Sequence, residues 1–143
     1  MKRNYATFAL FLCTLLILGL SVAAQKSDTP KVISYHGESE NWLGAFTAEF
    51  TGKRITELGY IKYKGKDVNS VGLVEVTYET NSGGLSSISY LAGLDSIDSP
   101  IGEKGTQTSS GAVGNNNQYS KTKIIKVTVE WSGKTETFNL YKQ

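Results

Sequence analysis

From about residue 31 onward, apolar and polar side chains alternate along much of this chain. Short runs rich in Val, Ile, Thr, Tyr and Phe are interrupted by Gly, Asn or Ser about every eight to twelve residues, which is typical of an antiparallel all-β domain. The clearest run covers 71–80, where Val74, Val76 and Tyr78 alternate with Glu and Thr side chains. We therefore expect one face of this strand in the core and the other in water.

The end of the chain repeats this pattern as a hairpin. Val127 and Val129 alternate with polar residues, and the two-residue turn Ser132-Gly133 leads into a returning strand. Trp42 and Trp131 have the parity of inward positions, so both are expected in the core. The pattern predicts an all-β fold, a single immunoglobulin-like antiparallel β-sandwich of about seven strands. The predicted strands cover 32–36, 42–51, 56–64, 71–80, 85–90, 125–131 and 134–141.

The alternation is lost between 92 and 121. This thirty-residue segment is rich in glycine and contains a Thr-Ser-Ser run and three consecutive asparagines. Loops of this length are uncommon in compact domains unless they are functional or disordered. We therefore expect a long polar loop, with a short strand near 111–118 as an alternative. Tyr119 lies in these polar surroundings and is the aromatic residue expected to be exposed.

The first 24 residues differ in kind from the rest. Lys2 and Arg3 precede a nearly continuous apolar run, and small residues lead up to Ala24, which predicts a secretory signal peptide cut after that residue. The twenty residues of 5–24 could also span a bilayer as an uncleaved anchor. Lipid attachment at Cys13 fits poorly because bulky residues precede the cysteine. The remaining 25–143 is expected to be one secreted or extracytoplasmic domain, in contact with the membrane only if the first segment is retained.

Without the predicted signal, the chain carries thirteen basic and thirteen acidic residues and no cysteine. This balance, with lysines dispersed along the chain, argues against nucleic acid as a partner and against a patch for anionic lipids. The missing cysteine excludes disulfides, thiolate metal sites and cysteine nucleophiles from 25–143.

The candidate chemistry centres on the chain's one histidine, His36, which stands near Glu38 and Glu40. A carboxylate beside an imidazole could make a general base. A single histidine cannot complete the usual zinc sites, however, and no glycine-flanked nucleophilic serine accompanies it. We therefore assign no catalytic residue and expect His36 in a solvated turn. Asp95, Asp98 and Glu103 lack the spacing of a calcium loop, so no metal or other cofactor is expected.

Two short motifs carry a resemblance. They are Gly-Glu-Ser-Glu-Asn-Trp at 37–42 and Val-Thr-Val-Glu-Trp-Ser-Gly-Lys-Thr-Glu at 127–136. Together they resemble a loose group of small exported or membrane-tethered proteins of Gram-positive bacteria, which have a leader and one β-rich domain. The resemblance implies no particular activity, so it assigns no functional residue. The residues of the first motif also predict a structural corner, in which polar side chains bond the backbone and Trp42 points inward.

These observations favour a non-catalytic binding or interaction domain of the cell envelope, with an unknown envelope protein or polysaccharide as its partner. One alternative is a small secreted hydrolase that uses His36 with Glu38 or Glu40, which requires a carboxylate within hydrogen-bond reach of the imidazole in a concave pocket. Another is a structural or inhibitor-like domain with an exposed apolar patch. The candidate binding surface comprises His36, Glu38, Glu40, Asn41 and Tyr119.

Overall fold

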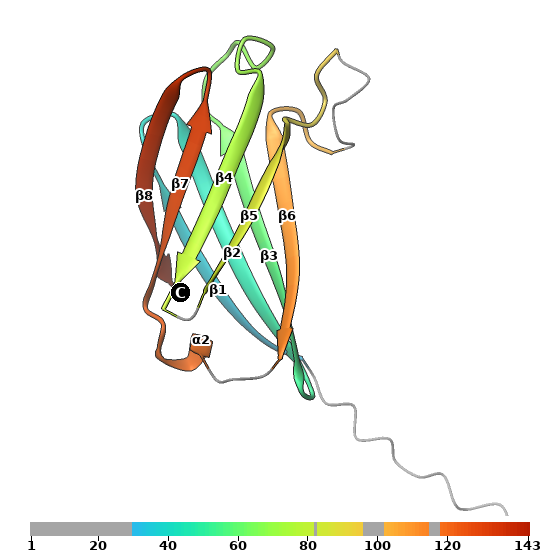
Figure 1. The fold of residues 1–143 in the computed structure, drawn as a ribbon, viewed down its shortest axis with the longest axis vertical. Helices are drawn as coiled ribbons and strands as arrows, with labels where there is room; N and C mark the ends of the chain where they lie inside the picture. Colours follow the sequence, from blue (N-terminus) through green and yellow to red (C-terminus); the bar gives the residue numbers. More distant parts are fainter. Residues whose placement is uncertain (1–29, 82, 96–101, 115–117) are drawn as a thin grey trace, which may run out of the picture.

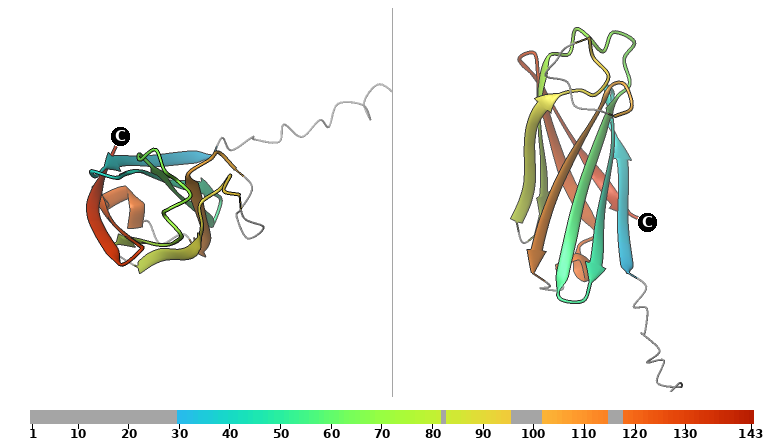
Figure 2. Two further views of the ribbon diagram at one scale, coloured as in Figure 1. Left: turned by 90° about the horizontal axis from the view of Figure 1, so that it is seen from above. Right: turned by 90° about the vertical axis from the view of Figure 1, so that its right-hand side faces the viewer.

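A computed structural model describes residues 30–81, 83–95, 102–114 and 118–143 as one curled antiparallel sheet (Figure 1). Its eight strands follow one another in the order β5-β4-β7-β8-β1-β2-β3-β6. Seen from above, they surround a common interior, so the sheet is nearly barrel-shaped (Figure 2). The strands are β1 (Lys31–Glu38), β2 (Trp42–Thr51), β3 (Arg54–Tyr63), β4 (Leu73–Thr80), β5 (Gly83–Tyr90), β6 (Thr106–Gly114), β7 (Ile124–Trp131) and β8 (Lys134–Lys142).

The all-β antiparallel prediction is confirmed, but the structure has one sheet of eight strands where about seven strands in two immunoglobulin-like layers were expected. The reason is that β1 pairs with strands on both sides. It pairs with β2 along its whole length, and it also pairs with β8 through Tyr35↔Lys142 and His36↔Tyr141. This second contact joins the strands β5-β4-β7-β8 to the strands β1-β2-β3-β6 in one continuous sheet. An alternating pattern reports which side chains face inward, and it is the same for two facing layers and for one curled sheet.

The eighth strand comes from the segment predicted to be a long loop. β6 pairs with β3 from Arg54↔Gly114 to Lys62↔Thr106. A single helical turn, α2 (Gln118–Lys121), follows near the end of the sheet where β6 finishes (Figure 1). The sequence of β6 is small and hydroxyl-rich, with none of the aromatic enrichment that usually marks a strand. Pairing with the free edge of β3 therefore decides its conformation.

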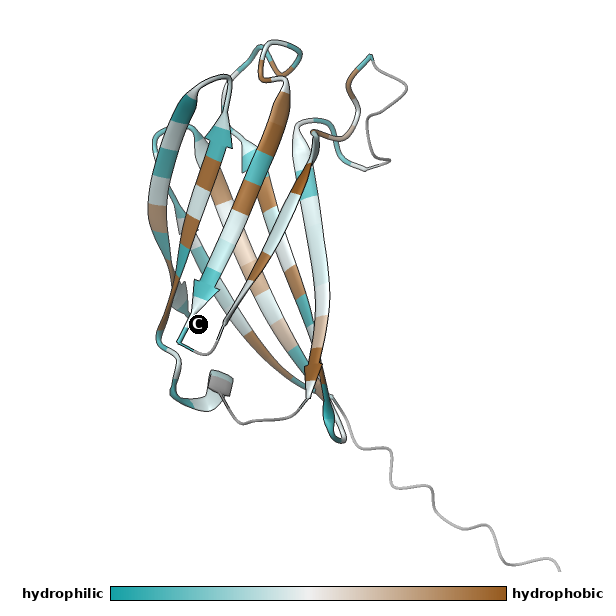
Figure 3. Cartoon of the chain, in the orientation of Figure 1, coloured by the Kyte–Doolittle hydropathy of each residue, from teal (hydrophilic) through white to brown (hydrophobic). Residues whose placement is uncertain are grey.

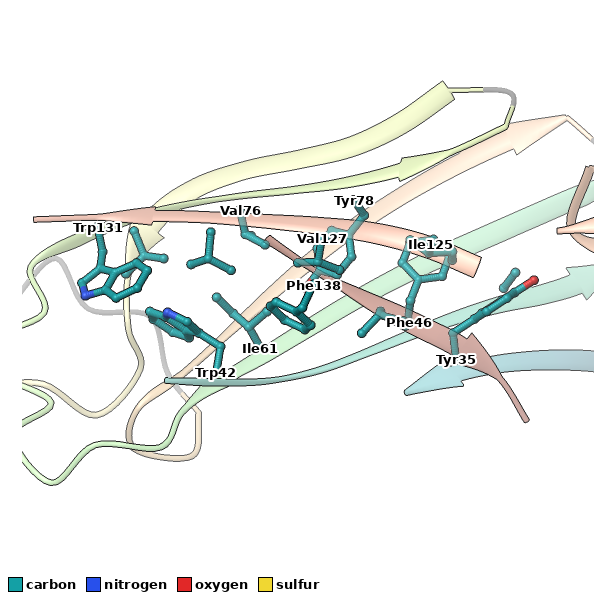
Figure 4. Packing of buried hydrophobic residues seen from close by; sticks show 14 of the residues in the cluster. Tyr35, Trp42, Phe46, Ile61, Val76, Tyr78, Ile125, Val127, Trp131 and Phe138 are labelled. Atoms are coloured by element: carbon teal, nitrogen blue, oxygen red, sulfur yellow. The ribbon is translucent and has the colours of Figure 1, made fainter. Parts of the chain in front are cut away.

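The core fills the interior of the sheet. Val74, Val76, Val127 and Val129 are fully buried, as their alternation predicted. In Figure 3, β4 shows a hydrophilic residue between hydrophobic ones. Both tryptophans are also buried, which confirms their inward prediction. Their rings meet edge to face, with centroids 5.2 Å apart, at one end of the core (Figure 4).

The two terminal strands of the sheet, β5 and β6, come together without completing a closed ladder. Just beyond the end of β5, the Ala92 N–H donates to the carbonyl of Thr106, the first residue of β6, over 2.6 Å. Further along, the hydroxyls of Ser87 and Ser109 are 2.5 Å apart. The two strands then separate toward the β4–β5 turn (Figure 1).

The predicted signal or anchor at 1–24, with Cys13, lies outside the described residues. No helix in the described part of the chain is both long and apolar enough to cross a membrane.

Candidate functional site

The corner between β1 and β2 is held by a carboxylate that reaches it from β8. Ser39 Oγ and the backbone N–H of Asn41 donate to Glu136 Oε2 over 2.5 Å and 3.2 Å, and the Asn41 side-chain amide donates to Glu136 Oε1. The Trp42 N–H in turn donates to Ser39 Oγ over 3.2 Å. This geometry agrees with the predicted structural corner. It also brings the two sequence motifs into direct contact, because Glu136 is the last residue of the second one.

The surroundings of Glu136 favour its charged form. Burial alone raises the pKa of this carboxyl, but the hydrogen bonds from Asn41 and Ser39, together with the charge of Lys64, outweigh burial and hold the pKa below its ordinary value. Sequence patterns did not single out this residue. Its parity matches that of the buried Phe138 and Leu140, so an acidic side chain at this position was the available signal.

Glu38 is paired with a lysine instead of with the histidine. Lys64 Nζ lies 3.1 Å from Glu38 Oε2 and donates over 2.8 Å to the Ser39 carbonyl. The Lys64 backbone N–H also donates to the Asn41 carbonyl over 2.8 Å. Asn41 and Glu38, two residues of the candidate binding surface, therefore help to stabilise the β1–β2 corner.

His36 lies exposed on the outer face of β1, between Tyr141 of β8 and Ala45 of β2. It belongs to the rim of a hollow of about 280 Å³ that also includes Glu38 and Leu43. Among the described residues, no carboxylate forms a hydrogen bond or an ion pair with its imidazole. Glu40 is exposed at the corner. The geometry that the hydrolase alternative requires is therefore not present between these side chains.

Tyr119 is buried, which overturns the prediction that it is exposed. Only 1% of the residue is accessible, and its ring packs 5.9 Å from that of Phe46. Its hydroxyl donates to the carboxylate of Glu57, and its carbonyl accepts a hydrogen bond of 3.3 Å from the Tyr35 hydroxyl. The error arose because the polar neighbours of Tyr119 in sequence indicated an exposed loop, whereas α2 turns this one side chain into the core.

Glu57 is a buried carboxylate that sequence reasoning did not identify. It lies on the inner face of β3, at the same parity as Ile55 and Ile61, and is 6% exposed. An acidic residue in an inward position was the available signal for it. Its hydrogen bond to Tyr119 ties α2 to the wall of the sheet, so its evident role is structural.

The acidic residues considered for calcium do not gather into a site. Glu103 forms an ion pair with Lys62 and accepts a 3.3 Å hydrogen bond from the Tyr60 hydroxyl. Asp95 is exposed, and Asp98 lies outside the described residues. Within the ranges that the structure describes, no three His, Cys, Asp or Glu side chains are placed to hold a metal ion.

A second hollow, of about 360 Å³, lies on the outer face near the β7–β8 turn. Its rim includes two strongly exposed apolar side chains, Leu73 at 51% and Ile88 at 58%. Glu75 of β4 is paired in register with Ile88 of β5 on one side and with Glu130 of β7 on the other. Sequence reasoning assigned these residues only to the outer faces of their strands, because the pairing that brings them together is set by the sheet.

Comparison of the chain with protein-family models, with curated proteins and with solved structures finds no match. The similarity to small exported proteins of Gram-positive bacteria stays a prediction. A functional proposal for this chain therefore rests on its own geometry.

Proposed function

We propose that this domain is a non-catalytic interaction module of the cell envelope, exported by its N-terminal segment. Its partner binds the outer face of β4, β5 and β7. The observation that carries the proposal is the pair of exposed apolar side chains, Leu73 and Ile88, at the rim of the 360 Å³ hollow. Exposed apolar side chains grouped around a hollow and bordered by charged residues are typical of interaction sites.

The arrangement around the corner supports a non-catalytic role. A general base needs an imidazole positioned by a hydrogen-bonding partner, and Glu38, the carboxylate that borders the same hollow as His36, is engaged by Lys64. The Glu136 carboxylate is occupied by donors from Ser39 and Asn41. These groups stabilise the fold of the corner, which accounts for the polar residues of the motif without a reaction.

The proposal is tested by capture of an envelope component on the immobilised domain. The double variant Leu73→Ser/Ile88→Ser should lose the captured component, while Val32→Ser, which removes an equally exposed apolar side chain (54%) outside the hollow, should retain it. Circular dichroism checks that each variant is folded. Equal capture by both variants would contradict the proposal.

The substitution His36→Ala distinguishes the interaction module from the hydrolase alternative. If the proposed function is right, this substitution leaves capture of the envelope component unchanged, because His36 is not part of the hollow near Leu73 and Ile88. A hydrolytic activity of the wild-type domain that His36→Ala abolishes, with folding intact, would replace the proposal with the hydrolase.

A further inference from the structure

The outward side chains of β4 and β7 form three register pairs with different charge. Glu79 faces Lys126, and the two form an ion pair of 2.5 Å. Thr77 faces Thr128 in the middle of the row. Glu75 faces Glu130, so two carboxylates stand directly opposite each other at the far end. The same two strands thus contain one matched and one mismatched charge pair.

The mismatched pair has no counter-ion in the described part of the chain. None of the ion pairs there includes Glu75 or Glu130. Lys134 borders the same hollow but is paired in register with Trp131, and it lies more than an ion-pair distance from both carboxylates. Like charges directly opposite on an antiparallel pair have Cβ atoms about 5 Å apart and destabilise the sheet. This repulsion is relieved when a cation enters between them.

The flanking side chains indicate what kind of cation fits. Ile88 is the register partner of Glu75 on its other side, and Leu73 precedes Glu75 on the same face of β4. A bare metal ion gains nothing from these apolar surfaces. An arginine side chain does, because its aliphatic stem can lie on Ile88 while its planar guanidinium forms hydrogen bonds with two carboxylates.

We propose that this hollow docks a basic, partly apolar peptide segment of a protein partner, with an arginine between Glu75 and Glu130 and an apolar neighbour against Leu73 and Ile88. This inference rests on the proposed interaction module and names the chemistry of its partner. A polysaccharide without cationic groups gains nothing from the two carboxylates, so the proposal selects protein between the two expected partner classes.

The test uses a defined probe, a fluorescein-labelled peptide with alternating leucine and arginine, and a matched peptide in which neutral citrulline replaces each arginine. Fluorescence anisotropy gives the Kd for the wild-type domain and for Glu75→Gln/Glu130→Gln. The control Glu49→Gln/Glu79→Gln removes the same number of charges from strand positions outside the hollow. We expect the first double variant to bind the arginine peptide at least about tenfold more weakly, and the control to stay within about twofold of wild type. The citrulline peptide should bind wild type as weakly as the arginine peptide binds the first variant.

Three results would overturn the inference. They are equal weakening by both double variants, equal binding of the citrulline peptide, and no binding of the arginine peptide at about 1 mM. The proposed function fails separately, through the capture experiment. If capture depends on Leu73 and Ile88 but not on Glu75 and Glu130, or if the captured component is a neutral polysaccharide, the binding face stands and the basic partner is wrong.

Discussion

Replacing Glu136 by alanine should destabilise the domain far more than its position near the surface indicates. The carboxylate accepts hydrogen bonds from Ser39 Oγ, the Asn41 backbone N–H and the Asn41 side-chain amide. Alanine leaves all three donors without this acceptor. These side-chain bonds connect β8 to the β1–β2 corner. Without them, β8 stays joined to β1 through the two register pairs of the sheet.

The size of the effect follows from these contacts. A hydrogen bond to a charged group contributes about 1.5–3 kcal/mol when it is well shielded from water. Glu136 is only half-buried, so we take about 1 kcal/mol for each bond and expect a loss of about 3 kcal/mol in the free energy of unfolding. For a domain of this size, that loss lowers Tm by about 10 °C.

The effect should also depend on pH. Because the folded protein holds the pKa of Glu136 below its ordinary value, the unfolded chain takes up the proton first on acidification. The contribution of Glu136 is therefore fully present above the ordinary glutamate pKa of about 4.3, and it is lost as the pH falls from there through the lowered pKa of the folded domain. The difference between wild type and Glu136→Ala should shrink between about pH 7 and about pH 3.

Urea unfolding followed by tryptophan fluorescence measures both effects. The control is Glu49→Ala, which removes an exposed glutamate from β2 and should change stability by less than about 0.5 kcal/mol. A loss for Glu136→Ala no greater than that of the control would refute the reasoning. So would a loss that stays constant from neutral to acidic pH.

Four further substitutions test other parts of the structure. Glu130→Lys should raise the free energy of unfolding by about 0.2–1 kcal/mol in thermal denaturation, because it creates an opposite-charge pair with Glu75, and it should abolish binding of the arginine peptide. Tyr78→Phe should leave stability unchanged or raise it, because burial raises the pKa of this tyrosine, so its hydroxyl stays neutral, and the hydroxyl has no hydrogen-bond partner among the described residues. By contrast, Tyr35→Phe removes a donor to the Thr122 carbonyl at 3.1 Å and should cost about 1 kcal/mol in urea unfolding. Gly59→Ala should cost about 1–3 kcal/mol in the same assay, because its Cβ would lie 2.4 Å from the Tyr78 ring; an unchanged midpoint would show that the ring can move aside.

The predictable part of the fold consists of strands with one face in the core and one in water. β2 was predicted with its observed bounds, and β7 and β8 within one residue. β6 was predicted only in part, as an alternative short strand near 111–118 that overlaps its last residues. Most of its inward positions, including Gln107 and Ser109, are small or polar, and such residues give no hydrophobic alternation. The joining of the sheet between β1 and β8 depends on two register pairs between opposite ends of the sequence, for which local patterns carry no signal.

The candidate site shows the same limit. The motif around Asn41 was identified from sequence, but its role depends on Glu136, which is 95 residues away in the chain. Glu75 and Glu130 each look like an ordinary outward glutamate on a half-buried strand. Their opposition appears only when the register of β4 against β7 is known, since a shift of one residue would turn one of them inward.

The most direct test of the account places a photoreactive p-benzoylphenylalanine in the intact protein in place of Ile88, with Val32 as the control position. We predict a cross-linked protein adduct from position 88 that is absent from position 32 and that the unlabelled arginine peptide suppresses. Cross-linking that is equally strong from position 32, or an adduct at position 88 that the peptide leaves unchanged, would contradict the claim that this hollow is the binding site for a basic protein segment.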